Sequence, residues 1–512
     1  MQPNLEIGLG RLRGTLRHGI RVFRGIPYAA PPVGARRFRP PEEPEPWGGV
    51  RDATRAGATA PQPGPRTFRG PLANLIGGGP ESEDCLTLNV WTPGTDGARR
   101  PVMVWIHGGA FVIGSGRTLV YSGSRLARQG DVVVVTLNYR LGALGFAHLG
   151  LTGAPGLEDA ANLGIQDQIA ALRFVREHIA AFGGDPDNVT VFGESAGAMS
   201  VGTLLGAPTA RPLFRRAILQ SGAAHNVSSR ERGARAAEIF LRELGATPQD
   251  AQRVLASAPV DAILAAQQRA SVALGLAHGT LPWQPAVDGR VVPRQPLAAI
   301  ADGEARAIPI LAGTNRDEWK LFTLFDAKTR RIDESGLRRR LARILPDAGD
   351  EAFELYRRSA EGGTAAPLAL WEAIQADRIF RYPASRLAEL QAAHQPATYK
   401  YLFDWTPRLG RDRIGACHAL EIPFVFGTIG HPAMRVLLGA AGGAQALSRT
   451  MREAWLSFAR SGEPRSDALG KWAPYDARER STMRIGRHFE LLRAPLDGLR
   501  SFWHPHLAEP AA

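Results

Sequence analysis

One pentapeptide, Gly193-Glu194-Ser195-Ala196-Gly197, lies between a strand pattern and a helix pattern and strongly limits what this chain can fold into. The preceding residues 188–192 are mostly β-branched or apolar, and small residues lead from the pentapeptide into a run that can form a helix. So sharp a reversal forces the serine into a strained conformation and leaves no room for a Cβ at positions 193 and 197. The arrangement is typical of a nucleophile elbow and predicts Ser195 as a catalytic nucleophile.

A bare Gly-x-Ser-x-Gly pattern also occurs by chance, so the prediction depends on partner residues. The first candidates lie in His107-Gly108-Gly109-Ala110-Phe111, directly after the apolar strand pattern 102–106. Acyl transfer passes through an oxyanion, and the N–H groups of glycines can approach that oxygen without obstruction. We expect Gly108 and Gly109 to be oxyanion donors, with Ala196 as the third. The alternative is a glycine turn that only ends the strand.

A serine hydroxyl needs a base to take its proton, so a histidine and an orienting carboxylate must follow it in the chain. Among twelve histidines, His418 lies in a glycine-punctuated loop that enters an apolar segment. A short strand pattern at 308–313 is followed by Asp317 and Glu318, and either carboxylate could be the acid on pattern alone. Each residue singly has a simpler interpretation as a loop histidine or a solvated charge. Together they follow Ser195 in the expected order.

Further motifs are spread over nearly the whole chain: Phe23-Arg24-Gly25-Ile26-Pro27-Tyr28, Glu83-Asp84-Cys85-Leu86, Asn138-Tyr139-Arg140, Phe182-Gly183-Gly184-Asp185-Pro186 and Trp472-Ala473-Pro474-Tyr475. With the elbow, this set resembles the type-B carboxylesterases of the α/β-hydrolase fold, which include cholinesterases and, closest in character, the bacterial p-nitrobenzyl esterases. In the family pattern the acid is the glutamate of Asp-Glu-Gly, which maps onto Glu318. The family's histidine, three residues before a glutamate, maps onto His418. The resemblance implies a triad of Ser195, Glu318 and His418 that needs no metal or organic cofactor.

Two positions depart from the family pattern. Trp319 stands where the family usually has glycine after the glutamate, which affects the expected pocket beside the acid. Many secreted members pair the cysteine of Glu-Asp-Cys-Leu with a cysteine at the position of Ala60. Cys85 therefore lacks its usual partner. We expect Cys85 and Cys417 to be small buried thiols in a reducing, cytoplasmic compartment.

The composition is typical of one large globular domain, which we expect to span residues 1–512, with 44% hydrophobic and 22% charged residues. The N-terminus lacks a basic start with an apolar run, and no stretch of about 18 apolar residues occurs. The net charge is +13, but only four of the 62 basic residues are lysines and the arginines are spread along the chain. The densest cluster, 338–340, alternates with leucines as in an amphipathic helix. We therefore expect neither a nucleic-acid nor a membrane partner.

Hydrophobic periodicity indicates an α/β architecture. Residues 6–25 alternate and predict a small antiparallel meander, whereas 132–137 is a continuous apolar strand. Apolar residues from 165 to 179 recur at helical spacing and end at Gly183-Gly184. This pattern predicts a mostly parallel mixed sheet with helices on both faces, to which the resemblance adds lid-like insertions. The family resemblance also implies a buried structural ion pair between Arg140 and Asp167.

The expected reaction is two-step acyl transfer on a small-molecule ester. Cholinesterases hold a cation with a tryptophan in the loop before the Glu-Asp-Cys-Leu motif, where this chain has only Phe68 and an apolar, glycine-rich segment at 70–79. We therefore expect neutral short- to medium-chain esters as substrates, unless Trp283 or Trp319 rebuilds a cation site. The alternatives are a hydrolase with the same triad acting on carbamates, lactones or polyester fragments, and a non-catalytic cholinesterase-like scaffold.

Overall fold

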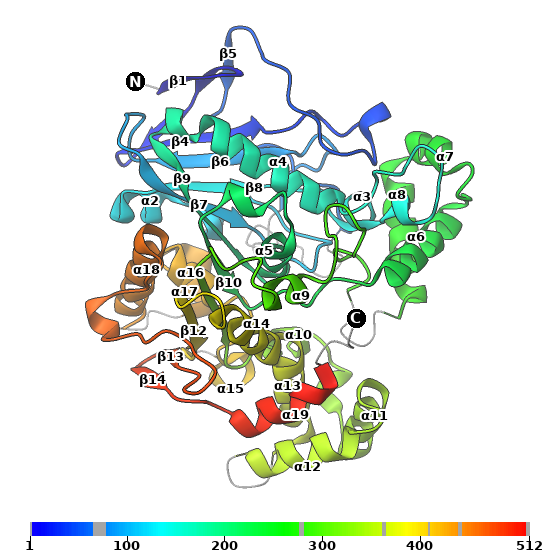
Figure 1. The fold of residues 1–512 in the computed structure, drawn as a ribbon, viewed down its shortest axis with the longest axis vertical. Helices are drawn as coiled ribbons and strands as arrows, with labels where there is room; N and C mark the ends of the chain where they lie inside the picture. Colours follow the sequence, from blue (N-terminus) through cyan, green and yellow to red (C-terminus); the bar gives the residue numbers. More distant parts are fainter. Residues whose placement is uncertain are drawn as a thin grey trace.

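A computed structural model of the chain describes residues 3–64, 78–275, 281–360, 365–407, 410–438 and 443–507. An eleven-stranded sheet runs through the centre, and helices pack on both of its faces (Figure 1). A second sheet of three strands, in the order β1-β2-β5, lies at the N-terminal end of the fold. Phe68 and residues 70–77 of the glycine-rich segment lie outside the described residues.

The large sheet has the spatial order β14-β13-β12-β11-β10-β9-β7-β8-β6-β4-β3. The strands are β1 Asn4–Ile7, β2 Gly10–Arg13, β3 Thr15–Arg17, β4 Ile20–Pro27, β5 Val50–Asp52, β6 Thr87–Thr92, β7 Arg100–Ile106, β8 Val133–Leu137, β9 Gly184–Glu194, β10 Arg216–Gln220, β11 Ile310–Asn315, β12 Thr398–Phe403, β13 Thr482–Ile485 and β14 Phe489–Leu492. The strands from β8 to β13 in this order pair in parallel, and the outer strands pair antiparallel. The predicted mostly parallel mixed sheet is therefore confirmed.

The predicted N-terminal meander is present, but it is divided between the two sheets. Strands β1 and β2 pair antiparallel and join β5, whereas β3 and β4 pair antiparallel at the edge of the large sheet. The chain passes from one sheet to the other at Gly14, where a Cβ would collide with the Phe23 ring and the Val22 carbonyl. Periodicity reports strands but not the sheet that each one joins, so the division was not predictable.

The helices are α2 Ser124–Gly130, α3 Gly142–Phe146, α4 Leu163–His178, α5 Ala196–Gly206, α6 Arg230–Leu244, α7 Ala251–Ser257, α8 Val260–Ala273, α9 Pro296–Ala301, α10 Lys320–Thr323, α11 Glu334–Ile344, α12 Gly349–Ser359, α13 Pro367–Ala376, α14 Tyr382–Ala392, α15 Arg411–Ile414, α16 Ile422–Val425, α17 Pro432–Leu438, α18 Ala444–Ser461 and α19 Asp497–Leu507. The π-helical turn η9 (Asp377–Arg381) joins α13 to α14. Short 3-10 turns are η1 Gly34–Arg36, η2 Leu119–Tyr121, η3 Leu149–Leu151, η4 Ile179–Phe182, η5 Arg211–Leu213, η7 Thr329–Arg331 and η10 Asp467–Leu469. In the described part of the chain, none of these helices is both long enough and apolar enough to cross a bilayer.

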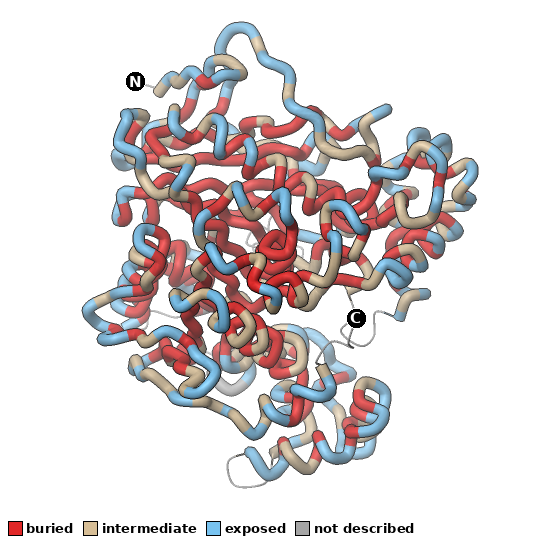
Figure 2. The backbone as a smooth tube through the Cα atoms, in the orientation of Figure 1, coloured by how far each residue is buried: buried red, intermediate tan, exposed pale blue. Residues whose placement is uncertain are grey.

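Strand alternation places a separate hydrophobic core on each face of the large sheet. In β7, Val104 and Ile106 face the core that contains α4 and α5, whereas Met103 and Trp105 face the core that contains α2 and α18. The central strands β6, β7, β8, β10, β11 and β12 are accordingly buried almost throughout their length (Figure 2). The helix predicted at 165–179 is α4, which continues through η4 and ends at Gly183 with φ 77°, as expected for a glycine stop.

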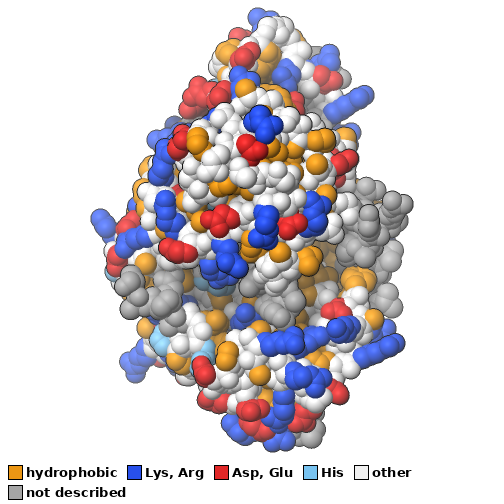
Figure 3. All heavy atoms as spheres, turned by 90° about the vertical axis from the view of Figure 1, so that its right-hand side faces the viewer, with side chains coloured by type: hydrophobic (Ala, Val, Ile, Leu, Met, Phe, Trp, Pro, Cys, Tyr) orange, Lys and Arg blue, Asp and Glu red, His pale blue; other side chains and the backbone are white. Residues whose placement is uncertain are grey.

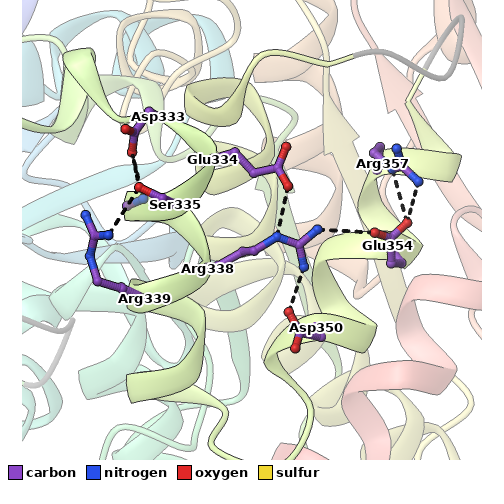
Figure 4. A network of polar contacts seen from close by, with 9 residues as sticks. Asp333, Glu334, Ser335, Arg338, Arg339, Asp350, Glu354 and Arg357 are labelled. Carbon is purple, nitrogen blue, oxygen red and sulfur yellow. Dashed lines mark hydrogen bonds and ion pairs between the residues drawn. The ribbon is translucent and has the colours of Figure 1, made fainter.

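The basic cluster at 338–340 lies on α11, whose buried face carries Leu337 and Leu341, as the amphipathic pattern predicted. The guanidinium of Arg338 contacts carboxylates of its own helix and of α12, at Glu334, Asp350 and Glu354 (Figure 4). It also stacks over the Phe353 ring at 3.9 Å. Over the face drawn in Figure 3, basic and acidic side chains are interspersed.

The ion pair between Arg140, which follows β8, and Asp167 of α4 is buried, as expected. The Arg140 guanidinium donates from Nε at 2.8 Å and from Nη2 at 2.6 Å to the two oxygens of Asp167. The backbone N–H of Arg140 donates to the same carboxylate at 2.9 Å. A bidentate pair with a third hydrogen bond satisfies both buried charges and orients the loop that follows β8.

Candidate functional site

The elbow lies where β9 ends and α5 begins, and Ser195 is the single residue between them. Its backbone has φ 55° and ψ −126°, a strained conformation for a non-glycine residue. A Cβ on Gly197 would collide with the Ile106 carbonyl of β7, so this position requires glycine. The Ser195 N–H donates to the carbonyl of Gln220 at 2.9 Å, which ties the elbow to the next strand. The predicted geometry of the elbow is confirmed.

Strand register gathers the other predicted residues at the same edge of the sheet. Gly193 pairs with Ile106 of β7 and with Leu219 of β10, so these three strands end together. Strands β11 and β12 continue the same parallel array. The loops that follow β7, β9, β11 and β12 carry the candidate oxyanion donors, the serine, the carboxylates and the histidine. Active sites of parallel sheets form at this carboxyl edge.

The glycine loop after β7 lies directly against the elbow. A Cβ on Gly108 would come within 3.0 Å of the Cβ of Ser195 and 2.6 Å of the carbonyl oxygen of Glu194. Only glycine allows this approach. Among the described residues, no protein acceptor takes the N–H of Gly108, Gly109 or Ala196. These three donors are therefore available to a bound oxygen beside the serine.

Glu318, rather than Asp317, meets the histidine. Its Oε2 lies 2.7 Å from Nδ1 of His418, and its Oε1 accepts the N–H of Asn315 at 2.7 Å. The Glu318 side chain is completely buried. Buried and doubly hydrogen-bonded, this carboxylate is held in the orientation that an imidazole partner requires.

Asp317 has a different partner set. Its Oδ2 accepts the backbone N–H of Ala416 at 2.8 Å and pairs with Arg316 at 2.8 Å, and its Oδ1 lies 3.3 Å from the Lys320 ammonium. These contacts fasten the loop that carries His418 to the end of β11. Asp317 thus supports the site without touching the imidazole.

Glu194 is the site residue that sequence reasoning missed. Its Oε1 lies 3.0 Å from Nε2 of His418, and both side chains are buried. The Ser195 hydroxyl has no hydrogen-bond partner among the described residues. The signal that could have identified Glu194 is its place in the elbow, one residue before the serine.

The carboxylates around the imidazole alter its proton affinity. Burial raises the pKa of Glu194 to about 8, against the opposing charge of His418. Burial lowers the pKa of His418, but the charges of Glu194 and Glu318 outweigh burial and raise it to about 9. The imidazole therefore lies between two carboxyl groups, one at each ring nitrogen.

A second layer of buried polar groups holds these residues. Glu421 accepts from the side-chain amides of Asn315 at 2.6 Å and Gln220 at 3.0 Å. Gln220 in turn accepts the indole N–H of Trp455 at 3.0 Å. Burial raises the pKa of Glu421, with the charge of Glu318 acting in the same direction. The network links β10, β11 and α18 beneath the imidazole.

Aromatic side chains surround the exposed side of the histidine. The ring centroids of Phe380 and Phe322 lie 4.7 Å and 5.2 Å from that of the imidazole, and the ring centroids of Trp319 and Phe322 lie 4.6 Å apart. Phe322 is 44% exposed, so this cluster borders solvent. Trp283, by contrast, is buried and donates its indole N–H to Ser271 at 2.7 Å. Of the two tryptophans considered from sequence, only Trp319 lies near the site.

The site has the parts of an acyl-transfer centre: a serine on an elbow, unpaired N–H donors beside it, and a histidine oriented by a carboxylate. No group of three or more His, Cys, Asp or Glu side chains that could hold a metal ion occurs in the part of the chain that the structure describes.

Comparison with known proteins shows the family to which the chain is similar. Residues 1–500 match a family described as the carboxylesterase family. The chain is 39% identical over 506 residues to the para-nitrobenzyl esterase of Bacillus subtilis (strain 168), covering 98% of each chain. It is 34% identical over 501 residues to the human cocaine esterase, covering 92% of this chain and 85% of the relative. Among solved structures, a carboxylesterase of Geobacillus stearothermophilus superposes with a TM-score of 0.86 at 42% identity, covering 98% of this chain and 99% of that one.

Proposed function

Since the chain belongs to the carboxylesterase family, has the α/β-hydrolase fold and is a carboxylic-ester hydrolase, we propose that it cleaves esters through Ser195, His418 and Glu318. The observation that carries the proposal is the 2.7 Å contact between His418 Nδ1 and Glu318 Oε2, at the same sheet edge as the strained serine. This is the orienting contact that a histidine base requires.

In the proposed mechanism, His418 leaves its contact with Glu194 and takes the proton of Ser195 as the hydroxyl attacks the ester carbonyl. Glu318 accepts from Nδ1–H and stabilises the imidazolium that forms. The N–H groups of Gly108, Gly109 and Ala196 hold the oxyanion. His418 then protonates the leaving alcohol, and water repeats the attack on the acyl-enzyme. These steps require no metal or organic cofactor.

We propose that the substrates are neutral esters of short to medium acyl chain. The uncharged rings of Phe322, Phe380 and Trp319 beside the imidazole support an apolar or aromatic group. The relative named for para-nitrobenzyl esters supports the same class. A net charge of +13 also disfavours a cationic substrate at long range.

A panel of p-nitrophenyl esters, with a choline ester and its uncharged dimethylbutyl isostere, tests this proposal. We expect kcat/KM to favour the uncharged isostere at least tenfold, or about 1.4 kcal/mol of transition-state discrimination. Comparable values would show that Trp319 and its neighbours bind a cation after all. Turnover of carbamates, lactones or polyester fragments above that of simple esters would instead favour the alternative substrates. No turnover by folded protein would indicate a scaffold.

The activity should fall as the pH falls, because a protonated His418 cannot accept the serine proton. An unperturbed histidine would place this limb at about pH 6.5. Glu194 and Glu318 raise the pKa of His418 to about 9. The acid limb of kcat/KM for the free enzyme should therefore lie at a higher pH than the limb at about 6.5 of an unperturbed histidine. Glu194→Gln removes one of the two charges and should move the limb toward lower pH. A pH profile identical to that of the parent protein would contradict this role for Glu194.

We also propose a cytoplasmic location, supported by two free, buried cysteines. Burial raises the pKa of the Cys417 thiol to about 12, and that of Cys85 still further, so neither is a reactive thiolate at neutral pH. Protein purified without reductant should therefore react at both cysteines after denaturation, and slowly before it. A titration that finds fewer than two thiols would reveal a disulfide and an oxidising compartment.

A further inference from the structure

Lys400 is the buried lysine of this chain, and it lies outside the catalytic site. Strand alternation in β12 sends Tyr399 and Tyr401 into one core and Lys400 to the opposite face, beneath α14 and α19. Only 6% of the residue is exposed. The other three lysines of the sequence are Lys320, Lys328 and Lys471, and none of them is buried. A lysine is almost never fully buried without a partner.

The ammonium of Lys400 has few partners. Its Nζ donates to the hydroxyl of Ser385 at 2.6 Å, and Ser385 donates onward to the carbonyl of Arg381 at 2.9 Å. The Tyr475 ring lies 5.9 Å away, at the limit of a cation–π contact. An ammonium has three donors, and within the described residues only one of them has an acceptor.

The charges around Lys400 also disfavour the ammonium. Burial and the guanidiniums of Arg381, Arg500 and Arg480 together lower its pKa to about 7, against the opposing charge of Asp377. Asp377 is itself engaged, because Arg381 contacts one of its oxygens and the Tyr356 hydroxyl donates to the other at 2.5 Å.

The two other guanidiniums share their carboxylates. Arg500 and Arg480 each contact Asp497, at 3.1 Å in both cases, and Arg500 lies 3.6 Å from Glu389. The Nε donors of Arg381 and Arg480 are buried without any hydrogen-bond partner. Arg381 lines the pocket, so its unpaired Nε is a spare donor from which an added anion can accept a hydrogen bond.

A cavity of about 30 Å³ opens at this point, lined in part by Lys400, Ser385, Arg381 and Arg500. On this measure one water needs about 10–15 Å³, so the cavity has room for about two water-sized groups. Leu496, which is 47% exposed, forms part of its wall and places the cavity close to the surface. A small neutral molecule can reach the amine from this side.

We propose that Nζ of Lys400 binds carbon dioxide covalently as a carbamate. The lone pair of the neutral amine attacks the carbon of CO₂, an N–C bond forms, and one C=O π pair moves onto oxygen. Nζ then releases one proton to solvent, which leaves R–NH–COO⁻. No oxidant, reductant or metal takes part.

The surroundings that disfavour the ammonium stabilise this product. The remaining N–H keeps the hydrogen bond to Ser385, and the two new oxygens enter the cavity among the guanidiniums. The unpaired Nε donor of Arg381, which lines the cavity, gains an anionic group nearby. At pH 7, a pKa of about 7 leaves roughly a thousandfold more neutral amine than on an exposed lysine of pKa about 10.4.

The test uses the full-length protein with ¹³C-bicarbonate at neutral pH. We expect one carbamate carbon resonance, whose intensity at saturation corresponds to about one carbamate group per chain. Trapping with a trialkyloxonium salt, followed by peptide mass analysis, should label Lys400 at least about tenfold more than Lys320, Lys328 or Lys471. Lys400→Met, which keeps the length of the side chain without the amine, should abolish the signal, whereas Lys471→Arg should retain it.

Absence of the resonance and of a trapped Lys400 peptide in the parent protein would overturn the proposal, whether or not Lys400→Met folds. A resonance that persists in Lys400→Met would assign it to another amine and would also overturn it. Thermal melts provide a third measurement, in which bicarbonate should raise Tm in the parent and in Lys471→Arg. An equal rise with chloride, without trapped carbamate, would identify a site for a free anion instead.

Discussion

Ser195→Ala should lower kcat for a p-nitrophenyl ester by on the order of 10⁴ or more, because the reaction loses its nucleophile. The same substitution should prevent covalent modification by an organophosphate, which the parent protein should take up once per chain. Intact-mass analysis before and after treatment measures the adduct, and a steady-state assay measures the rate. Serine and alanine both carry a Cβ, so alanine at position 195 meets the same backbone strain as serine does. The fold should therefore persist.

A thermal melt of Ser195→Ala close to that of the parent is the control for folding. If folded parent protein keeps an unmodified mass after prolonged treatment and shows no turnover, Ser195 is not an activated nucleophile. Retention of the adduct in Ser195→Ala would point to another nucleophile.

Glu318→Gln should reduce turnover by roughly 10³ to 10⁴, although the substitution changes the size of the side chain very little. A glutamine can still accept the N–H of Asn315, but its amide group can donate toward Nδ1 of His418. The imidazole would then adopt the wrong tautomer and lose the charge that stabilises the imidazolium. Steady-state kinetics on one neutral ester, above the acid limb, measures the effect.

Asp317→Asn is the matched control, because it also replaces a carboxylate with the amide of the same length, at the neighbouring residue. Asparagine can still accept the Ala416 N–H with its side-chain oxygen, and the lost charge faces Arg316 and Lys320 rather than the imidazole. Most of the activity should remain. The reverse ranking of the two variants would reassign the acid to Asp317.

Much of the site could be predicted because its signals are local. The strand pattern before Ser195, the helix after it and the glycine at 197 are properties of a few consecutive residues, and the structure has each of them in place. The sheet type followed in the same way from continuous apolar strands and helical spacing. The organisation as a single domain stays a prediction.

Other features depended on contacts between distant segments. Pattern alone left Asp317 and Glu318 equivalent, and the family resemblance was needed to choose. The structure separates them because the loop after β12 brings Ala416 to Asp317 and His418 to Glu318, about a hundred residues along the chain. Glu194 was missed for the same reason, since its contact with His418 joins the end of β9 to that loop.

The sequence by itself determined the elbow, the order of the catalytic candidates and the mostly parallel sheet with helices on both faces, because backbone strain, glycine placement and hydrophobic period are encoded locally. Only the tertiary structure decided which carboxylate orients His418, how Glu194 alters its pKa, and that Lys400 is buried among arginines. Those outcomes depend on strand register and burial. Both are set by packing of the whole chain, and they change the electrostatic environment of a side chain without changing its neighbours in the sequence.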